Sequence, residues 1–378
     1  MRDLLDELDR WRREAGPVAI ARVVDLDGSG PREPGAAMAV NDQGEVLGSV
    51  SGGCVEGAVV TEALEVLRTG RRNVVTFGYS DDDAFAVGLT CGGTIHLYVE
   101  PLDWWGPGAG EQDDEAVPSV YDELARSTRA EQPVALATVI DGRGKGAKLL
   151  VRPGEEPVGS LGDPDLDRVV ARDALGELAA GSTEVRHYGE HGEAREDAVA
   201  VFVESFAPPP RMLVFGAVDF TAALVRVAKV LGYRVTVCDA REVFATRARF
   251  PQADEVIVDW PDRLLDRIGA DVTPRDAICV LTHDAKFDVP ALLAALATPA
   301  GYVGAMGSRR THAERMARLR EAGVDEAALA RIRAPIGLDL GARTPEETAV
   351  SICAEILADR TGRYDPRPLR QTDGPIHA

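Results

Sequence analysis

Short apolar runs separated by glycine-rich turns dominate the first part of the chain. Segments of this kind lie at residues 17–26, 36–40, 45–50, 73–77 and 94–99. Apolar runs of this length, bounded by turn residues, predict β-strands. Val59, Leu64 and Leu67 recur at helical spacing and predict a helix over residues 55–68, which ends at Gly70. The pattern therefore predicts an α+β unit.

The same order of segments returns over residues 133–204. Residues 133–137 (PVALA) match 17–21 (PVAIA), residues 158–162 (VGSLG) match 47–51 (LGSVS), and residues 202–204 (FVE) match 98–100 (YVE). An internal duplication is the simplest interpretation of these matches. The alternative is two unrelated α+β segments that share common strand composition.

The two copies differ in their polar, glycine-rich segments. Only the first copy carries residues 28–35 (GSGPREPG), 51–54 (SGGC) and 90–93 (TCGG). The second copy has lost all three, so the chemistry is expected in the first copy. Stretches rich in proline, glycine and acidic residues, at 106–118 and 207–210, predict the boundaries between units. Three segments are expected, residues 1–106, 118–206 and 211–378.

The last segment reads as a βαβ unit. A buried strand over residues 212–215 leads into a helix that Gly232 ends, and a second strand over 234–237 stops before Asp239. An acidic side chain at that point binds a ribose hydroxyl in dinucleotide-binding domains. The turn after Gly216 fits poorly, since Val218 adds a Cβ and Asp219 a negative charge where phosphates approach. Both a dinucleotide site and a scaffold without one remain open.

Polar loops follow the next predicted strands, at residues 255–258, 277–281 and 302–303. Doubly wound sheets place their ligands at such strand ends. One loop carries Thr282, His283 and Asp284, and another carries Gly304, Gly307, Ser308 and Arg309 at the start of a helix. Ser308 is expected to cap that helix and Arg309 to help bind an anion. The alternative is an ordinary helix start with solvated arginines.

These patterns predict an α/β protein, in which an N-terminal α+β unit with a degenerate internal repeat precedes a C-terminal Rossmann-like parallel-sheet domain. Sixty-two acidic against 42 basic residues give a net charge of −20, which disfavours general binding to nucleic acid or an anionic membrane. The amphipathic start and the broken apolar stretch at 289–307 resemble neither a signal peptide nor a membrane span. A soluble, cytoplasmic protein is expected.

The glycine-rich segments resemble those of the XdhC/CoxI family, the accessory factors of xanthine dehydrogenase and carbon monoxide dehydrogenase type molybdoenzymes. Residues 28–35 look like the family's G-S-x-P-R-x-P-G loop, 48–56 like its G-S-V-S-G-G-C-V-E segment and 91–93 like its C-G-G. Residues 281–284, 304–310 and 334–347 are similar to further characteristic stretches. One departure is the turn at 216–220, GAVDF, where the family usually has G-A-G-H-V.

The resemblance implies a cofactor chaperone or maturation factor rather than an enzyme. Such a protein binds molybdenum cofactor, as molybdopterin or its cytidine dinucleotide form, and protects it. It supports the exchange of an oxo for a sulfido ligand and hands the cofactor to an apo-molybdoenzyme. A cysteine desulfurase is the implied sulfur donor and partner, and a homodimer is the implied assembly. NAD is not expected as a cofactor.

The chain has five cysteines, Cys54, Cys91, Cys238, Cys279 and Cys353, without a C-x-x-C pair, which favours reduced thiols. Cys54 and Cys91 each adjoin a Gly-Gly pair that permits close backbone approach, so they are candidate molybdenum contacts or sulfur carriers. The alternative for each is a small buried hydrophobe. Arg32 is a candidate for the pterin phosphate.

The full set of candidate cofactor-binding residues is Arg32, Ser51, Gly52, Gly53, Cys54, Cys91, Gly92, Gly93, Gly216, Asp239, Thr282, His283, Asp284, Gly304, Gly307, Ser308 and Arg309. Two other functions compete with a maturation factor. One is an NAD(P)-dependent oxidoreductase that uses the Rossmann domain, with His283 beside Asp284 as the base. The other is a scaffold that binds the target without touching the cofactor.

Overall fold

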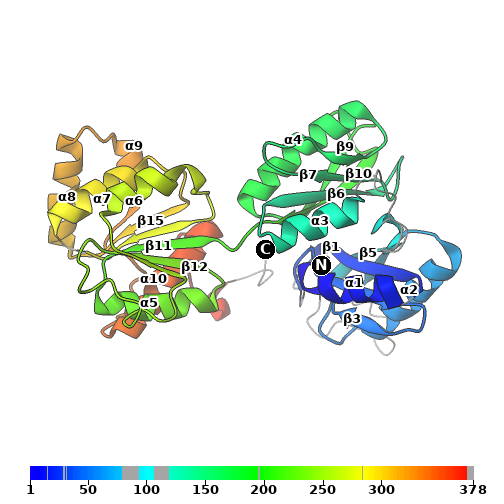
Figure 1. Ribbon diagram of the computed structural model, residues 1–378, viewed down its shortest axis with the longest axis horizontal. Coiled ribbons are helices and arrows are strands. Elements are labelled where there is room, and N and C mark those ends of the chain that lie inside the picture. The colour runs from blue at the N-terminus through cyan, green and yellow to red at the C-terminus, as the bar shows by residue number, and fades with distance from the viewer. Residues whose placement is uncertain are drawn as a thin grey trace. The chain divides into compact units, whose positions relative to one another are not determined.

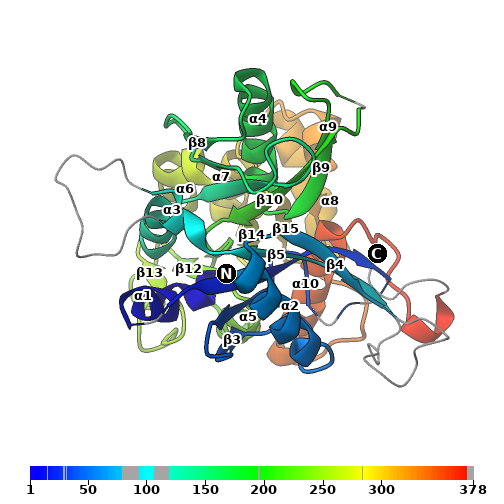
Figure 2. The same ribbon diagram turned by 90° about the vertical axis from the view of Figure 1, so that its right-hand side faces the viewer.

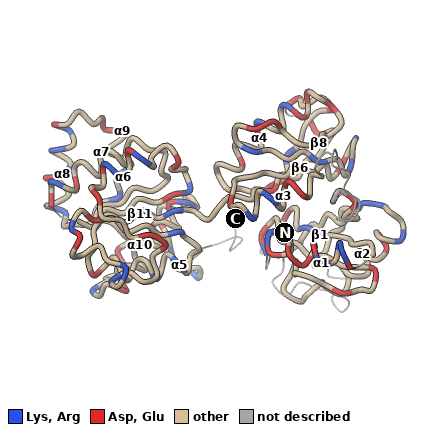
Figure 3. The backbone as a smooth tube through the Cα atoms, viewed as in Figure 1, with Lys and Arg blue, Asp and Glu red and all other residues tan. Residues whose placement is uncertain are grey.

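The computed structural model describes residues 1–14, 16–28, 30, 32–78, 93–105, 119–194, 196–282 and 284–372. The chain divides into two compact units (Figure 1). The first contains Met1–Pro208 together with the C-terminal end from Leu369, and the second contains Pro209–Pro368. Acidic and basic residues are interspersed along both units (Figure 3).

The first repeat forms a five-stranded antiparallel sheet covered by one helix. Its elements are η1 (Arg2–Leu4), α1 (Leu5–Glu14), β1 (Val18–Asp27), β2 (Ala37–Asn41), β3 (Val46–Gly48), α2 (Glu56–Thr69), β4 (Asn73–Phe77), β5 (Thr94–Pro101) and η2 (Asp103–Trp105). The strand order is β3-β2-β1-β5-β4. Val59, Ala63 and Val66 of α2 pack against alternate residues of β1 and β5. Because the other face of β1 is buried as well, β1 is a continuous apolar run in the sequence rather than an alternating one.

The second repeat builds the same sheet again. Its elements are α3 (Val120–Arg129), β6 (Val134–Asp141), β7 (Lys148–Val151), β8 (Val158–Ser160), α4 (Pro164–Ala180), β9 (Glu184–Tyr188) and β10 (Val199–Phe206). Its strand order, β8-β7-β6-β10-β9, is that of the first sheet position by position. The degenerate internal repeat expected from the sequence is therefore confirmed as a feature of the fold.

The two sheets of the first unit face each other, while α2 and α4 cover their opposite faces (Figures 1 and 2). Val24, Tyr98, Ile140 and Phe202 form a small apolar core between the sheets. A larger apolar cluster joins α1 and α3 to strands of both repeats. The two copies thus share buried surface and form one unit.

The second unit is a six-stranded parallel sheet with helices on both faces. Its elements are β11 (Arg211–Phe215), α5 (Asp219–Val230), β12 (Arg234–Cys238), β13 (Glu255–Ile257), α6 (Pro261–Ile268), η3 (Gly269–Asp271), β14 (Ala277–Val280), α7 (Ala285–Leu296), β15 (Tyr302–Ala305), α8 (Arg309–Glu321), α9 (Glu326–Leu329), β16 (Ile332–Arg333) and α10 (Pro345–Arg360); η4 (Leu369–Gln371) follows. The order β13-β12-β11-β14-β15-β16 reverses direction between β11 and β14.

This strand order is that of the dinucleotide-binding Rossmann fold, so the expected fold class is confirmed. Gly216 follows β11 and packs tightly on Thr282, which follows β14, because an added Cβ on Gly216 would lie 2.8 Å from Thr282 Cγ2. These two residues therefore mark the point where such folds bind ligands. None of the helices in the described ranges is long and apolar enough to cross a membrane.

Candidate functional site

Two of the glycine-rich segments of the first repeat meet at one end of its sheet. β1 ends beside the start of β5, where an added Cβ on Gly28 would lie 3.7 Å from the Cα of Gly93. The side chain of Leu26 contacts the position of Gly30 and packs in the same cluster as Cys54. The segments at Gly28 and Gly93 are therefore neighbours in the fold, and the Cys54 loop packs on the same apolar core.

Two of the predicted residues of these segments, Cys91 and Gly92, lie outside the described residues. Gly93 is buried beside Gly28. Arg32 is exposed, in a loop of which Ser29 and Pro31 are not described. Its contact with a pterin phosphate stays a prediction.

Glu56 organises the loop that carries Cys54. Its carboxylate accepts hydrogen bonds from Ser49 Oγ at 2.6 Å, from the Ser51 hydroxyl at 2.5 Å and N–H at 3.0 Å, and from the Gly53 N–H at 2.8 Å. Ser51 Oγ in turn accepts from the N–H groups of Cys54 and Val55, both at 3.0 Å. Partial burial favours protonation of Glu56, but the hydrogen bonds from Ser49 and Ser51 outweigh it and lower its pKa to about 2.

The backbone N–H groups of this loop donate their hydrogen bonds within the protein. The N–H of Gly52 also donates, to Ser49 Oγ at 2.9 Å, so every N–H from Ser51 to Val55 has a protein partner. The loop is therefore no cradle for a phosphate, unlike glycine-rich loops that leave their N–H groups open. Gly52 and Gly53, with φ of 75° and 118°, are exposed, and no atom would crowd a Cβ added to either. Cys54 is half-buried and packs against the apolar core of the sheet.

The second repeat provides an internal comparison. Asp167 takes the place of Glu56 and accepts from Ser160 Oγ at 2.7 Å and from the Leu161 N–H at 2.6 Å. There α4 begins at Pro164, three positions ahead of its acid, whereas α2 begins at its own acid, Glu56. The first repeat thus replaces one turn of helix with the loop Gly52–Val55. This unwinding supports the expectation that the first copy carries the chemistry.

Glu56→Gln is expected to destabilise the first unit by about 1–2 kcal/mol at pH 7, because charge-assisted hydrogen bonds are lost. The depressed pKa gives the pH dependence. The stabilisation by Glu56 is complete above the ordinary glutamate pKa and disappears as the pH falls towards about 2. Urea unfolding, followed by tryptophan fluorescence, measures the free energy of unfolding at pH 7 and its change between pH 7 and pH 3. Glu65→Gln on the exposed face of α2 is the matched control and should change nothing measurable. If the loss of unfolding free energy in Glu56→Gln were the same at pH 7 and pH 3, the charged carboxylate of Glu56 would not be what stabilises the loop.

The cysteines fall into two environments. Cys238, Cys279 and Cys353 are buried, and burial raises the pKa of Cys238 and of Cys353 to about 12 and that of Cys279 further. Cys54 is half-buried on its loop, and no cysteine of the described ranges is in a disulfide. Among the described cysteines, Cys54 is thus the one placed to react or to bind a metal. The described ranges hold no group of three or more histidine, cysteine or acidic side chains suited to a metal ion.

In the second unit, Asp239 lies where a ribose-binding carboxylate is expected, but its oxygens are occupied. It accepts from the Ala217 N–H at 2.8 Å and from Arg241 at three nitrogens, between 2.7 and 2.9 Å. Burial raises the pKa of Asp239, and these hydrogen bonds lower it below its usual value. Arg249 donates to the carbonyl of Ala217 at 2.9 Å and so holds the same turn from the other side. A dinucleotide would have to displace these contacts, and weak or absent NAD binding stays a prediction.

The other predicted residues of this unit have structural partners. Thr282 hydrogen-bonds Asp288, which also accepts from Arg315 at 2.7 Å; Arg315 donates to the Met306 carbonyl at 2.8 Å. This chain joins the ends of β14 and β15. Ser308 caps α8 by accepting from the Thr311 N–H at 3.1 Å, as expected, and Asp284 caps α7.

Glycine is required sterically at two of the predicted positions. An added Cβ on Gly304 would lie 2.5 Å from Ile336 Cδ1, and Gly307 has a φ of 145°. Arg309 is exposed at the start of α8, and His283 lies outside the described residues. The part of these residues in ligand binding stays a prediction. Sequence reasoning missed Glu56, although an acid in the first helical turn after a Ser-Gly loop is a recognisable signal.

Known proteins match both units. A family model described as the XdhC Rossmann domain matches residues 212–356, and one described as the XdhC and CoxI family matches residues 11–78 and 127–189. A protein of Bacillus subtilis, named as a probable xanthine dehydrogenase subunit, is 27% identical over 359 residues, which are 94% of this chain and 96% of that protein. The molybdenum cofactor insertion chaperone PaoD of Escherichia coli is 27% identical over 342 residues, 90% of this chain and 83% of PaoD.

A solved structure also resembles the whole chain. It is described as a xanthine dehydrogenase from Bacillus halodurans, and the match covers 97% of this chain and 98% of that chain with a TM-score of 0.63. The two sequences are 24% identical, so the likeness speaks for the fold alone.

Proposed function

The chain belongs to the XdhC and CoxI family, and from that premise we propose that it binds molybdenum cofactor and serves the maturation of a molybdoenzyme of the xanthine dehydrogenase or carbon monoxide dehydrogenase type. It protects the cofactor, supports its sulfuration with a cysteine desulfurase as sulfur donor, and delivers it to the apo-enzyme in the cytoplasm. It acts as a homodimer. The chaperone name of PaoD, which matches 90% of this chain, supports the cofactor assignment.

The observation that carries the proposal is the unwound helical turn of the first repeat. A loop with two exposed glycines and a half-buried cysteine, on a scaffold fixed by Glu56, is absent from the equivalent position of the second repeat. A thiol sulfur is a soft ligand that suits a molybdenum–dithiolene centre. The residues of this loop therefore fit the group.

Each residue has a part in the proposal. When bound, the cofactor supplies a metal centre whose oxo ligand is exchanged for sulfido. Cys54 contacts the metal or carries the sulfur, Ser51 and Glu56 hold its loop, and Gly52 and Gly53 admit the ligand. Since the N–H groups of this loop already donate within the protein, Arg32 of the same unit binds the phosphate in this proposal.

The binding test uses the purified full chain. It is incubated with molybdenum cofactor and passed through a desalting column, and the retained cofactor is oxidised to its fluorescent pterin derivative and quantified. Retention near one cofactor per chain, followed by activation of apo-xanthine dehydrogenase, is the expected result. Absence of retention would refute the proposal and leave the scaffold alternative. The oxidoreductase alternative has little support, because Asp239 is already engaged by Ala217 and Arg241.

A further inference from the structure

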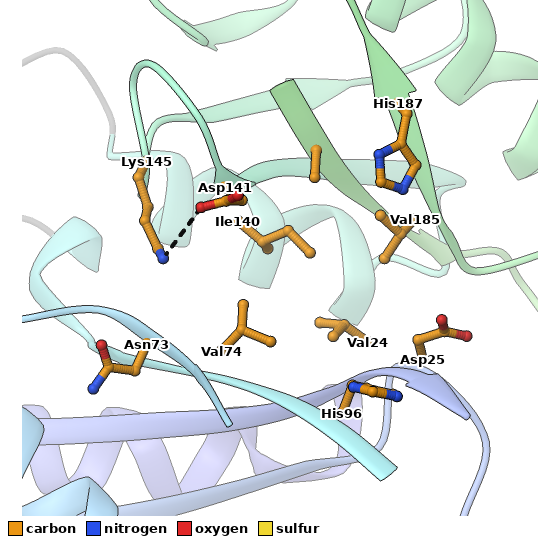
Figure 4. A pocket seen from close by; sticks show the side chains of 11 residues that line it. Val24, Asp25, Asn73, Val74, His96, Ile140, Asp141, Lys145, Val185 and His187 are labelled. Atoms are coloured by element: carbon orange, nitrogen blue, oxygen red, sulfur yellow. Dashed lines mark ion pairs between the residues drawn. The ribbon is translucent and has the colours of Figure 1, made fainter. Parts of the chain in front are cut away.

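A cleft opens between the two sheets of the first unit, along their outer strands β4 and β9 (Figure 4). Its volume of about 510 Å³ lies in the range of small-molecule sites. The middle of the cleft is apolar and is formed by Val24, Val74, Ile140 and Val185, with polar side chains at both ends. None of these residues belongs to the loop that carries Cys54.

Each of the two sheets contributes a β-bulge to the floor of the cleft. In the ladder between β1 and β5, Val23 pairs with Leu97 and Asp25 with His96, so that Val24 is an extra, bulged residue. In the ladder between β6 and β10 the register shifts at the equivalent place, and Ile140 is the extra residue. A β-bulge bends its strand and redirects a side chain, and such bulges are common beside active sites. Both bulged residues line this cleft.

The two polar ends differ in their free hydrogen-bonding capacity. At one end Asp141 lies 3.7 Å from Lys145 Nζ. At the other end Asp25 lies near two histidines, His96 and His187 (Figure 4). The Leu26 N–H donates to Asp25 Oδ1 at 2.8 Å, and within the described ranges no group donates to Oδ2. Asp25 therefore lines this end of the cleft and has one carboxylate oxygen to which no described group donates.

The histidines at this end are held in place. His96 lies between Asp27 Oδ2 and Thr76 Oγ1, each at 3.0 Å, and His187 contacts Asp197 at 2.5 Å. This end also adjoins the signature segments, because Gly28 follows the last residue of β1, Asp27, and β5 begins one residue after Gly93. A molecule that lies in the cleft can therefore extend towards those segments.

On the basis of the proposed function, we propose that this cleft receives the pterin end of the molybdenum cofactor. A pterin is a flat bicyclic ring, which the apolar middle of the cleft suits, and its pyrimidine edge carries an amino group and a ring N–H. Asp25 accepts hydrogen bonds from that edge, since a carboxylate can take two parallel donors. The carboxylates of Asp25 and Asp141 repel the phosphate and the dithiolene, which stay at the signature segments.

The test measures binding of two free pteridines to the full chain by their own fluorescence. The probes are pterin and lumazine, which carries an oxo group in place of the 2-amino group of pterin. Pterin should bind at least tenfold more tightly than lumazine, because lumazine turns an acceptor towards the carboxylate. Asp25→Asn should weaken pterin binding at least tenfold and reduce the preference over lumazine. Val74→Trp should block both probes by filling the cleft, because Val74 is 41% exposed and tolerates a larger side chain.

The matched control is Asp42→Asn, an exposed aspartate after β2 that does not line the cleft; it should bind pterin as the parent does. Retention of molybdenum cofactor by the same variants separates the two proposals. If the parent retains cofactor and Asp25→Asn and Val74→Trp retain it equally well, the cleft assignment is wrong and the proposed function stands. If the parent retains no cofactor, the proposed function fails and the cleft assignment fails with it.

Discussion

Cys54→Ser is expected to lower sulfido transfer to an apo-molybdoenzyme at least tenfold, and to lower cofactor retention with it. A thiolate is both the nucleophile in sulfur chemistry and a soft metal ligand, whereas a serine hydroxyl stays protonated and is a hard ligand. The substitution changes one atom on a half-buried loop whose shape depends on Ser51 and Glu56. The fold should therefore be unaffected. Cys91→Ser, outside the described residues, is expected from the sequence to act in the same way.

Cys353→Ser is the matched control. This thiol is buried in α10, and burial raises its pKa to about 12, so it is not available as a thiolate. The measurement combines activation of apo-xanthine dehydrogenase, in the presence of a cysteine desulfurase, with fluorescence of the retained, oxidised cofactor. If Cys54→Ser and Cys91→Ser both bind cofactor and activate the target as well as the parent, the two cysteines are packing residues and the assignment is wrong.

Much of the fold was predictable because most strands are short, largely apolar runs bounded by turn residues. The apolar runs at residues 17–26 and 73–77 correspond to β1 and β4. The repeat was predictable because the matched segments follow one another in the same order in both copies. The structure confirms it, since the strand order is the same in both sheets. β16 was not predicted, because it has only two residues, too few for a periodic pattern.

The candidate site was predictable in its glycines and cysteines but not in its supporting contacts. Glu56 is recognisable in the sequence as an acid of a first helical turn, but its four hydrogen bonds depend on the path of the loop before it. The cleft was missed because a bulge is a property of two paired strands, and the sequence of one strand does not reveal the register of the pair. The engagement of Asp239 by Arg241 likewise depends on the tertiary structure.

The buried ion pair between the two repeats could not be predicted from the sequence either. Arg22 lies in an apolar strand and looks like an exposed residue of it, yet its side chain is fully buried. Its guanidinium binds Glu100 at 2.6 Å and also pairs with Glu204, which are the matched glutamates of the two copies. The rings of Tyr98 and Phe202, also matched, lie 5.8 and 5.7 Å from it. Thr138 is the residue of the second copy that corresponds to Arg22. An arginine at position 138 would face Arg22, and the two positive charges would repel each other.

Arg22→Met is expected to destabilise the first unit by about 3–5 kcal/mol. Removing one partner of a buried ion pair leaves the other charge without compensation. Here two buried carboxylates lose their arginine. Glu100 keeps Lys148 at 2.8 Å and Arg72 at 3.6 Å, whereas no other ion-pair partner lies within 4 Å of Glu204 in the described ranges. Burial lowers the pKa of Lys148 to about 8, so it compensates Glu100 less well as the pH rises through 8. Urea unfolding at pH 7, followed by the fluorescence of Trp11 and Trp104, measures the loss.

Arg68→Met is the matched control, because Arg68 pairs with Glu65 on the exposed face of α2 and exposed pairs contribute little. It should leave the unfolding midpoint where it is. The double variant Arg22→Met/Glu204→Gln should recover part of the stability that Arg22→Met loses, because the stranded carboxylate of Glu204 is then neutral. Equal midpoints for the single and double variants would mean that Glu204 carries no uncompensated charge. In that case the ion pair between Arg22 and Glu204 would not help to hold the two repeats together.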